Sequence, residues 1–203
     1  MTIFNKCHAV FVGFLAYVIV ATVGYTINQG DYFQNEYLFI IINTFLISLS
    51  VAYAKWFDMI SLRSLTKKEV LLFIGIFLLC VLVNIGYHAF FSVSSGAGYQ
   101  HLEAASTGIS LSFIASATIF GPILEEFVFR GILQGAVFDN SWLGLVLTAS
   151  LFSFLHAPYD FPSFIYYLLG GLLLGFAYKK SQNLWVSTLV HMFYNSLPLL
   201  TYF

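Results

Sequence analysis

The run Gly121-Pro-Ile-Leu-Glu-Glu-Phe-Val-Phe-Arg130 lies inside an apolar stretch, Gly108 to Phe138, that carries no other charged residue. The stretch is long enough to cross a bilayer as a helix, because about 20 mostly apolar residues suffice. A charged side chain at mid-bilayer costs about 3 kcal/mol on insertion scales, so two carboxylates and one guanidinium need a reason to be there. The stretch therefore predicts a membrane-spanning helix that carries a polar site.

Composition extends this prediction to the whole chain. Of its 203 residues, 60% are hydrophobic and 8% are charged, whereas about a quarter of the residues of a soluble domain are charged. The formal net charge of -1 provides no basic surface for nucleic acid, which we exclude as a partner. Cys7 and Cys80 are too far apart for a CxxC motif, and we expect both to be small buried side chains.

Apolar runs separated by short charged segments predict about seven spanning helices, and the fold class is therefore an all-α polytopic transmembrane bundle. No internal repeat or soluble domain interrupts the series. The predicted spans are His8 to Asn28, Tyr37 to Ala54, Val70 to Phe91, Gly108 to Phe138, Trp142 to Ala157, Pro162 to Tyr178 and Leu184 to Tyr202.

The distribution of cations predicts the orientation, because Lys and Arg are enriched in cytoplasmic loops. When the spans are counted off alternately, one side receives Lys6, Lys55, Arg63, Lys67, Lys68, Lys179 and Lys180. The opposite loops receive Asp31, Glu36, Glu103 and Asp160 and no cation. We therefore expect a multi-pass protein of the cell membrane, with a cytoplasmic N-terminus and an external C-terminus.

Helical geometry separates the two neighbouring glutamates. Glu126 and Arg130 are four residues apart and about 40 degrees apart around an α-helix, so they should form an ion pair. Glu125 lies about 140 degrees from Arg130 and is left without that partner, which suits a carboxyl that transfers protons. Pro122 lacks an amide donor and should kink or restart the helix, which frees backbone carbonyls near Thr118.

Two later spans carry histidines at comparable depth. His156 follows Phe152 by four residues, and His191 precedes Asn195 by four, so the last two share a helical face. Counted from the cationic side, Glu125 lies roughly 18 Å deep, His156 roughly 21 Å, His191 roughly 12 Å and Asn195 roughly 18 Å. Taken singly, each histidine is more typical of a hydrogen-bonded bundle residue than of a catalyst. Their shared depth predicts one polar site.

These motifs resemble those of a known family. Glu125-Glu126-Phe-Val-Phe-Arg130 is similar to its EExxxR motif, Phe152-Ser-Phe-Leu-His156 to its FxxxH, and His191-Met-Phe-Tyr-Asn195 to its HxxxN. This is the CAAX-protease and bacteriocin-processing family, also called Abi, which includes the Rce1-type prenyl proteases. All three motifs occur in the family's order, and the resemblance covers about the last hundred residues.

The resemblance implies an intramembrane endopeptidase that hydrolyses a peptide bond of a membrane-associated peptide or protein. Glu125 would be the general base that activates a water with His156, while His191 and Asn195 would stabilise the oxyanion. Glu126 and Arg130 would support the site. On this reading residues 1–104 are N-terminal transmembrane helices and residues 105–203 the catalytic core of one integrated membrane domain.

Metal dependence stays open at this point. Family members have also been described as metalloproteases, and Glu125, His156 and His191 would be the ligands of a zinc ion. The sequence has no HExxH motif, and Asn195 is a better hydrogen-bond donor than zinc ligand. We therefore favour water activation that requires no cofactor, with zinc as the alternative.

Other functions remain alongside the peptidase. The same family includes bacteriocin self-immunity proteins, so a non-catalytic immunity or scaffold role is the alternative. A proton-coupled carrier is disfavoured because the chain shows no hydropathy-matched halves, and a di-iron bundle because it lacks paired Glu-x-x-His motifs. The substrate could be a pheromone, a bacteriocin leader or a membrane protein, and the resemblance does not imply that it is prenylated.

Overall fold

The computed structural model describes residues 3–29, 35–91, 110–156, 158 and 160–197. This part of the chain is helical and contains no strand, which confirms the all-α class. The first three helices are α1 (Ile3–Gln29), α2 (Glu36–Trp56) and α3 (Lys67–Phe90). Thr66 begins α3 with a capping box, in which its hydroxyl accepts from the Glu69 amide while the Glu69 carboxylate accepts from the Thr66 amide.

One continuous rod, Leu111–Val137, follows, and its winding changes along its length. It consists of α5 (Leu111–Ala115), a π-helical segment η2 (Ser116–Phe120), α6 (Gly121–Glu126) and a second π-helical segment η3 (Phe127–Val137). The predicted break at Pro122 thus takes the form of π winding rather than a sharp kink. π segments are rare and often lie at functional sites.

The last three helices are α7 (Trp142–Leu155), α8 (Phe161–Ser181) and α9 (Leu184–Ser196). The helix boundaries agree with the predicted spans to within three residues wherever they can be compared, except that α1 begins five residues before His8. The predicted termini at 108, 157 and 202 lie outside the described residues.

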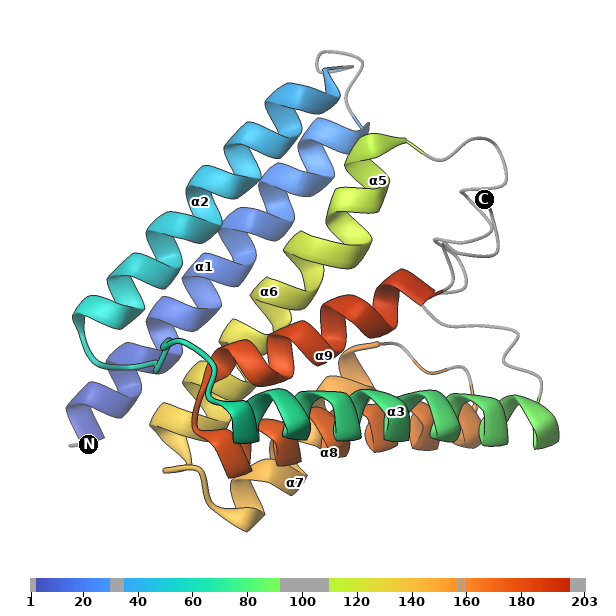
Figure 1. Cartoon of the computed structure of the whole chain (residues 1–203). Coiled ribbons are helices and arrows are strands. Elements are labelled where there is room, and N and C mark those ends of the chain that lie inside the picture. Colours follow the sequence, from blue (N-terminus) through green and yellow to red (C-terminus); the bar gives the residue numbers. More distant parts are fainter. Residues whose placement is uncertain (1–2, 30–34, 92–109, 157, 159, 198–203) are drawn as a thin grey trace.

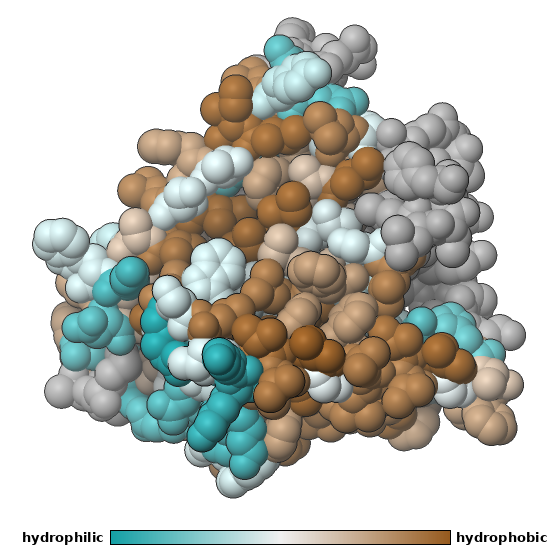
Figure 2. Space-filling view, in the orientation of Figure 1, coloured by the Kyte–Doolittle hydropathy of each residue, from teal (hydrophilic) through white to brown (hydrophobic). Residues whose placement is uncertain are grey.

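In the part of the chain that the structure describes, four helices are long and apolar enough to cross a membrane, namely α2, α3, the rod and α8. Shorter apolar helices cover Phe4–Ile19 and Trp142–Leu155. Large hydrophobic side chains point outward along these helices, and Figure 2 shows them over most of the visible face. Such a surface matches lipid rather than water, so the fold is a helical bundle of the membrane type.

Two groups of helices lean against each other (Figure 1). In the first, α1 packs on α2 and on η3. In the second, α7 and α3 pack on α8, and α9 contacts α3, α8, α6 and η2. Because α9 contacts η3, in the first group, as well as α3 and α8 in the second, it brings its side chains to the centre of the bundle.

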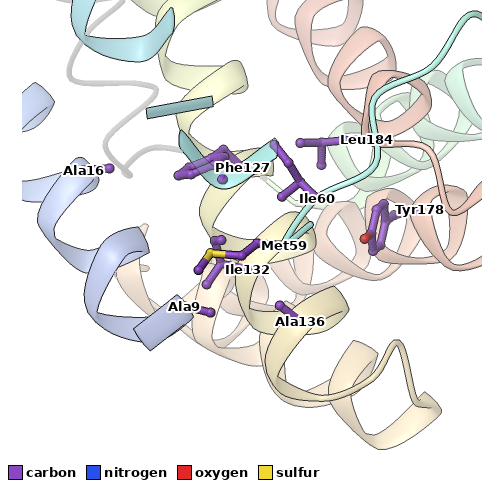
Figure 3. Close-up of a cluster of buried hydrophobic side chains, with 10 residues drawn as sticks. Ala9, Ala16, Met59, Ile60, Phe127, Ile132, Ala136, Tyr178 and Leu184 are labelled. Carbon is purple, nitrogen blue, oxygen red and sulfur yellow. The ribbon is translucent and has the colours of Figure 1, made fainter. Parts of the chain in front are cut away.

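Small residues allow α1 to approach η3 closely. Ala9 and Ala16 are buried in a cluster with Phe127 and Ile132 (Figure 3). At Gly13, an added Cβ would lie 3.1 Å from Cγ2 of Ile132. Small-residue stripes of this kind are typical of helix contacts in membranes, where close packing replaces the hydrophobic effect.

The two cysteines differ in environment. Cys80 is buried between α3, α8 and α9, as predicted. Cys7 is exposed, so the prediction that it is buried was wrong. In an apolar helix at the edge of a membrane bundle, an apolar side chain can face lipid as readily as protein, and hydropathy does not distinguish the two.

Charged and amide groups tie the chain together at the end of the bundle where the N-terminus lies (Figures 1 and 2). Lys6 pairs with Asp139, and Lys179 donates to the carbonyl of Asn140. Arg63 donates to Glu69 and to the carbonyl of Ser181. Predicted cytoplasmic cations from α1, the α2–α3 connection and α8 therefore gather at one end. That this end faces the cytoplasm stays a prediction.

Candidate active site

The ion pair predicted for the long rod is present. Arg130 Nη1 lies 2.9 Å from Glu126 Oε1, and the two side chains are 1% and 0% exposed. Arg130 Nη2 donates to the carbonyl of Gly171 in α8 at 3.0 Å. The ring of Phe152 lies 4.6 Å from the guanidinium carbon, a cation–π contact. The pair therefore joins the rod to α7 and α8 and is compensated on several sides.

Phe152 contacts both this ion pair and the two histidines. Its ring centroid lies 4.2 Å from that of His156 and 5.9 Å from that of His191. The Phe152 side chain is buried. In the motif Phe152-x-x-x-His156, the phenylalanine thus provides the apolar wall against which both imidazoles lie.

His191 is oriented by the buried ion pair. Its Nδ1 lies 3.0 Å from Glu126 Oε1, so Nδ1 carries a proton and donates to the carboxylate. The other ring nitrogen, Nε2, lies 3.9 Å from Oε2 of Glu125. In the neutral imidazole this Nε2 presents a lone pair to Glu125.

A backbone carbonyl orients His156 in the way that Glu126 orients His191. It caps the end of α7, and its Nδ1 lies 2.7 Å from the carbonyl oxygen of Phe152. Because a carbonyl only accepts, Nδ1 carries the proton and Nε2 is left with a lone pair. That Nε2 lies 3.7 Å from Oε2 of Glu125. The ring of Tyr167, on α8, covers the imidazole at 4.7 Å between centroids.

Glu125 completes the convergence. Its Oε2 is buried and has no hydrogen-bond partner, although the side chain as a whole is 26% exposed. This oxygen therefore faces two further acceptor atoms, the Nε2 atoms of His156 and His191, at separations too long for direct hydrogen bonds. Acceptors arranged in this way suit a small ligand that donates protons, or a cation.

The spacing can be compared with that of a zinc site. A tetrahedral zinc with bonds of about 2.1 Å sets neighbouring ligand atoms roughly 3.4 Å apart, whereas the two measured separations are 3.7 and 3.9 Å. Within the described ranges, no group of three or more His, Cys, Asp and Glu side chains has the geometry of a metal site. The residues would hold zinc only after moving closer together.

Asn195 has a different neighbour from the one expected of an oxyanion donor. Its Nδ2 donates to the carbonyl of Ala117 in η2 at 3.0 Å. In the π winding of η2, where Gly121 donates to Ser116, the next residue, Pro122, would donate to Ala117 but has no N–H. Asn195 therefore satisfies the carbonyl that the proline leaves, one residue before the predicted position, and fastens α9 to η2.

Several site residues were not predicted. Gln134, one turn beyond Arg130, donates to the carbonyl of Gly175 at 2.9 Å, repeating the contact between Arg130 and Gly171. Tyr167 was also missed. The glycines at 171 and 175 carried a usable signal, because their four-residue spacing matches that of the two donors on the rod.

Comparisons with known proteins match the part of the chain that carries these residues. Residues 107–197 match the family described as type II CAAX prenyl endopeptidase Rce1-like. The chain is 28% identical over 126 residues to "Putative membrane peptidase YdiL" of Bacillus subtilis (strain 168), covering 61% of this chain and 50% of the relative. It is 28% identical over 129 residues to "UPF0177 protein YvdC" of Lactococcus lactis subsp. lactis (strain IL1403), covering 63% and 49%.

A third relative is "Membrane-embedded CAAX protease MroQ" of Staphylococcus aureus (strain USA300), 33% identical over 89 residues, which cover 41% of this chain and 36% of the relative. The chain thus spans about half the length of the first two relatives and less of the third. No solved structure matches the chain. The matches confirm the family resemblance drawn from the motifs.

Proposed function

We propose that this chain, whose residues 107–197 match the Rce1-like endopeptidases, is a membrane-embedded protease that hydrolyses a peptide bond of a membrane-associated substrate. One observation carries the proposal: the buried, unpartnered Oε2 of Glu125 faces two imidazole nitrogens whose protons are held elsewhere. This is an arrangement for a base and its aligning groups.

In the proposed reaction, a water donates one hydrogen to Glu125 and the other to His156. Glu125 Oε2 and His156 Nε2 lie 3.7 Å apart. If a water oxygen lies about 2.8 Å from each of them, the two directions from the water form an angle of about 85 degrees, which is near what its two hydrogens allow. The water oxygen bonds to the substrate carbonyl carbon while Glu125 takes its proton. The carbon–oxygen π pair moves onto the carbonyl oxygen. Glu125 then returns the proton to the amide nitrogen as the C–N bond breaks.

The role of His191 in stabilising the oxyanion has a protonation requirement. Its Nδ1–H is committed to Glu126, so Nε2 can donate to an oxyanion only when the ring is doubly protonated. The proposal is therefore that His191, an acceptor at Nε2 in its neutral form, takes up a proton there before the oxyanion forms, while Glu126 holds Nδ1 on the other side. Asn195 retains a second amide hydrogen beyond the one given to Ala117 and can donate it to the same oxygen.

The test uses purified full-length protein in lipid nanodiscs and a fluorogenic peptide library tethered by a single acyl chain. We expect the wild-type chain to cleave the library and the Glu125→Gln variant to leave it intact. A chain that binds the peptides without cutting them would instead favour the immunity or scaffold role.

The same assay distinguishes metal-free water activation from the zinc alternative. Water activation by Glu125 and His156 alone predicts that activity survives treatment with 1,10-phenanthroline and EDTA. Activity that is lost and then restored by Zn²⁺, together with stoichiometric zinc that disappears in His156→Ala, would establish the zinc alternative with Glu125, His156 and His191 as ligands.

The proposed orientation has its own test. Reporter fusions after Phe203 should be active only outside the cell, and fusions within residues 179–182 only in the cytoplasm. A cytoplasmic C-terminus would contradict the orientation predicted from the cations.

A further inference from the structure

Two asparagines lie within long apolar helices, and their side-chain amides have different hydrogen-bond partners. Asn43, in α2, is buried, and its Nδ2 donates to the carbonyl of Phe39 in its own helix at 3.0 Å. Asn84, in α3, instead uses its Oδ1 to accept from the hydroxyl of Tyr166 at 2.9 Å. Among the described residues no hydrogen bond occupies the Nδ2 of Asn84, and the residue is partly exposed rather than buried.

A chain of hydroxyls fixes this amide. Because Tyr166 donates to Asn84, its oxygen accepts from the hydroxyl of Tyr194. The three residues come from α3, α8 and α9, so three helices contribute to one polar cluster. The fixed Oδ1 determines the direction of the Asn84 amide, whose two hydrogens are then presented away from the tyrosines.

The cluster adjoins the candidate active site. Tyr166 directly precedes Tyr167, whose ring covers His156, and the two tyrosine rings lie 5.5 Å apart. Tyr194 follows His191 by three residues, one turn of α9, and directly precedes Asn195. A peptide in extended conformation advances about 3.3 Å per residue, so a few residues next to the scissile bond would reach the cluster.

An extended peptide inside a bilayer needs partners for its backbone groups, because neither water nor a helix supplies them. We propose that Asn84, held by Tyr166 and Tyr194, is a substrate-binding subsite whose amide hydrogens bind a backbone carbonyl of the substrate beside the scissile bond. This subsite rests on the proposed peptidase function. It recognises backbone rather than a side chain, and α3 lies outside the part of the chain that matches the family.

The experiment compares Asn84→Leu with the matched control Asn43→Leu, using the acyl-tethered peptide library in nanodiscs. We expect Asn84→Leu to raise KM about fivefold with little change in kcat, the effect of losing one neutral hydrogen bond. Tyr166→Phe should act in the same direction, because it releases the amide from its fixed orientation. Asn43→Leu should leave KM unchanged.

Equilibrium binding of the same library, measured by fluorescence anisotropy in the Glu125→Gln background, gives a readout that does not require catalysis. A fivefold weaker Kd on adding Asn84→Leu supports a peptide-binding role of Asn84 independently of turnover. Equal affinity with and without Asn84, or no measurable binding by the parent chain, overturns the subsite. Failure of the peptidase proposal shows separately, as wild-type protein that binds the library without cleaving it.

Discussion

The two faces of the rod at positions 125 and 126 carry the same side chain in opposite environments. On one face, Glu126 is fully buried and contacts both Arg130 and His191. On the other, Glu125 is partly exposed and its inner oxygen has no hydrogen-bond partner. Oε2 of Glu126 also lacks a hydrogen-bond partner, so the two residues differ in their ion pairs and their exposure. A carboxylate paired with Arg130 holds helices together, whereas one without a guanidinium partner can still take a proton. Burial alone would rank the two in the reverse of the order that the proposed function gives them.

The largest expected effect breaks the open face. Glu125→Gln keeps the size of the side chain but removes the base, so turnover should fall by about a hundredfold to ten-thousandfold. Protein yield and apparent Tm should stay near wild type, because no ion pair is lost. The measurement is kcat for the peptide library in nanodiscs beside a thermal melt. Equal losses of protein in this variant and in Glu126→Gln would show that Glu125 is structural.

The next effect breaks the ion pair of Glu126 with Arg130. Glu126→Gln or Arg130→Ala leaves one buried charge without its partner, which should cost about 3–5 kcal/mol of unfolding free energy. Both variants should accumulate poorly and melt earlier, and activity should fall with them. Replacing both residues, as Glu126→Gln with Arg130→Met, removes the lone charge. The double variant should therefore recover stability but not activity, since His191 loses its charged partner.

A variant of Asn195 tests whether this residue donates to the oxyanion. If its free amide hydrogen reaches the oxyanion, Asn195→Ala should lower kcat by roughly a hundredfold with a smaller change in KM. Near-normal turnover with His191 intact would assign Asn195 only to the contact with Ala117. Asn195→Gln serves as the control that retains an amide while changing its reach.

A change in the spacing between α7 and α8 should give a smaller effect, and the adjacent glycine provides a control. A Cβ at Gly171 would lie 3.2 Å from Cα, Cβ and O of Ala149, whereas a Cβ at Gly170 would meet nothing within 4 Å. Gly171→Ala should therefore push α7 from α8 and cost about 1–3 kcal/mol. Activity should also fall, because α7 positions His156. Gly170→Ala should resemble wild type in both melt and turnover, and an equal effect of the two would exclude helix spacing as the cause.

The smallest effect lies at the cationic end. A hydrogen bond from Lys6 lowers the pKa of Asp139 below its ordinary value of 3.8. A lowered carboxyl pKa stabilises the fold above the ordinary value, and this contribution disappears as the pH falls through the lowered pKa. Asp139→Asn should thus lower the apparent Tm at neutral pH by at most a few degrees. The difference from wild type should disappear as the pH falls below 3.8 and through the lowered pKa, and a difference that persists at still lower pH would have another cause.

Much of this arrangement was predictable because it follows from helical periodicity. The pairing of Glu126 with Arg130 and the isolation of Glu125 depend on angles around an axis, which the sequence specifies once the helix is identified. The partners of His156 and His191 do not, since they depend on how α7 and α9 cross the rod. The π winding of η2 and η3 was missed for a related reason: apolar α and π segments have the same hydropathy and differ only in hydrogen-bond pattern.

The bond from Asn195 to the Ala117 carbonyl has a consequence for how related sequences should diverge. An amide restored at position 122 would compete with Asn195 for the carbonyl it now satisfies, so either residue alters the selective value of the other. Among homologous chains, we expect positions 122 and 195 to covary: lineages that lose the proline should be released to replace the asparagine, unless catalysis itself retains it.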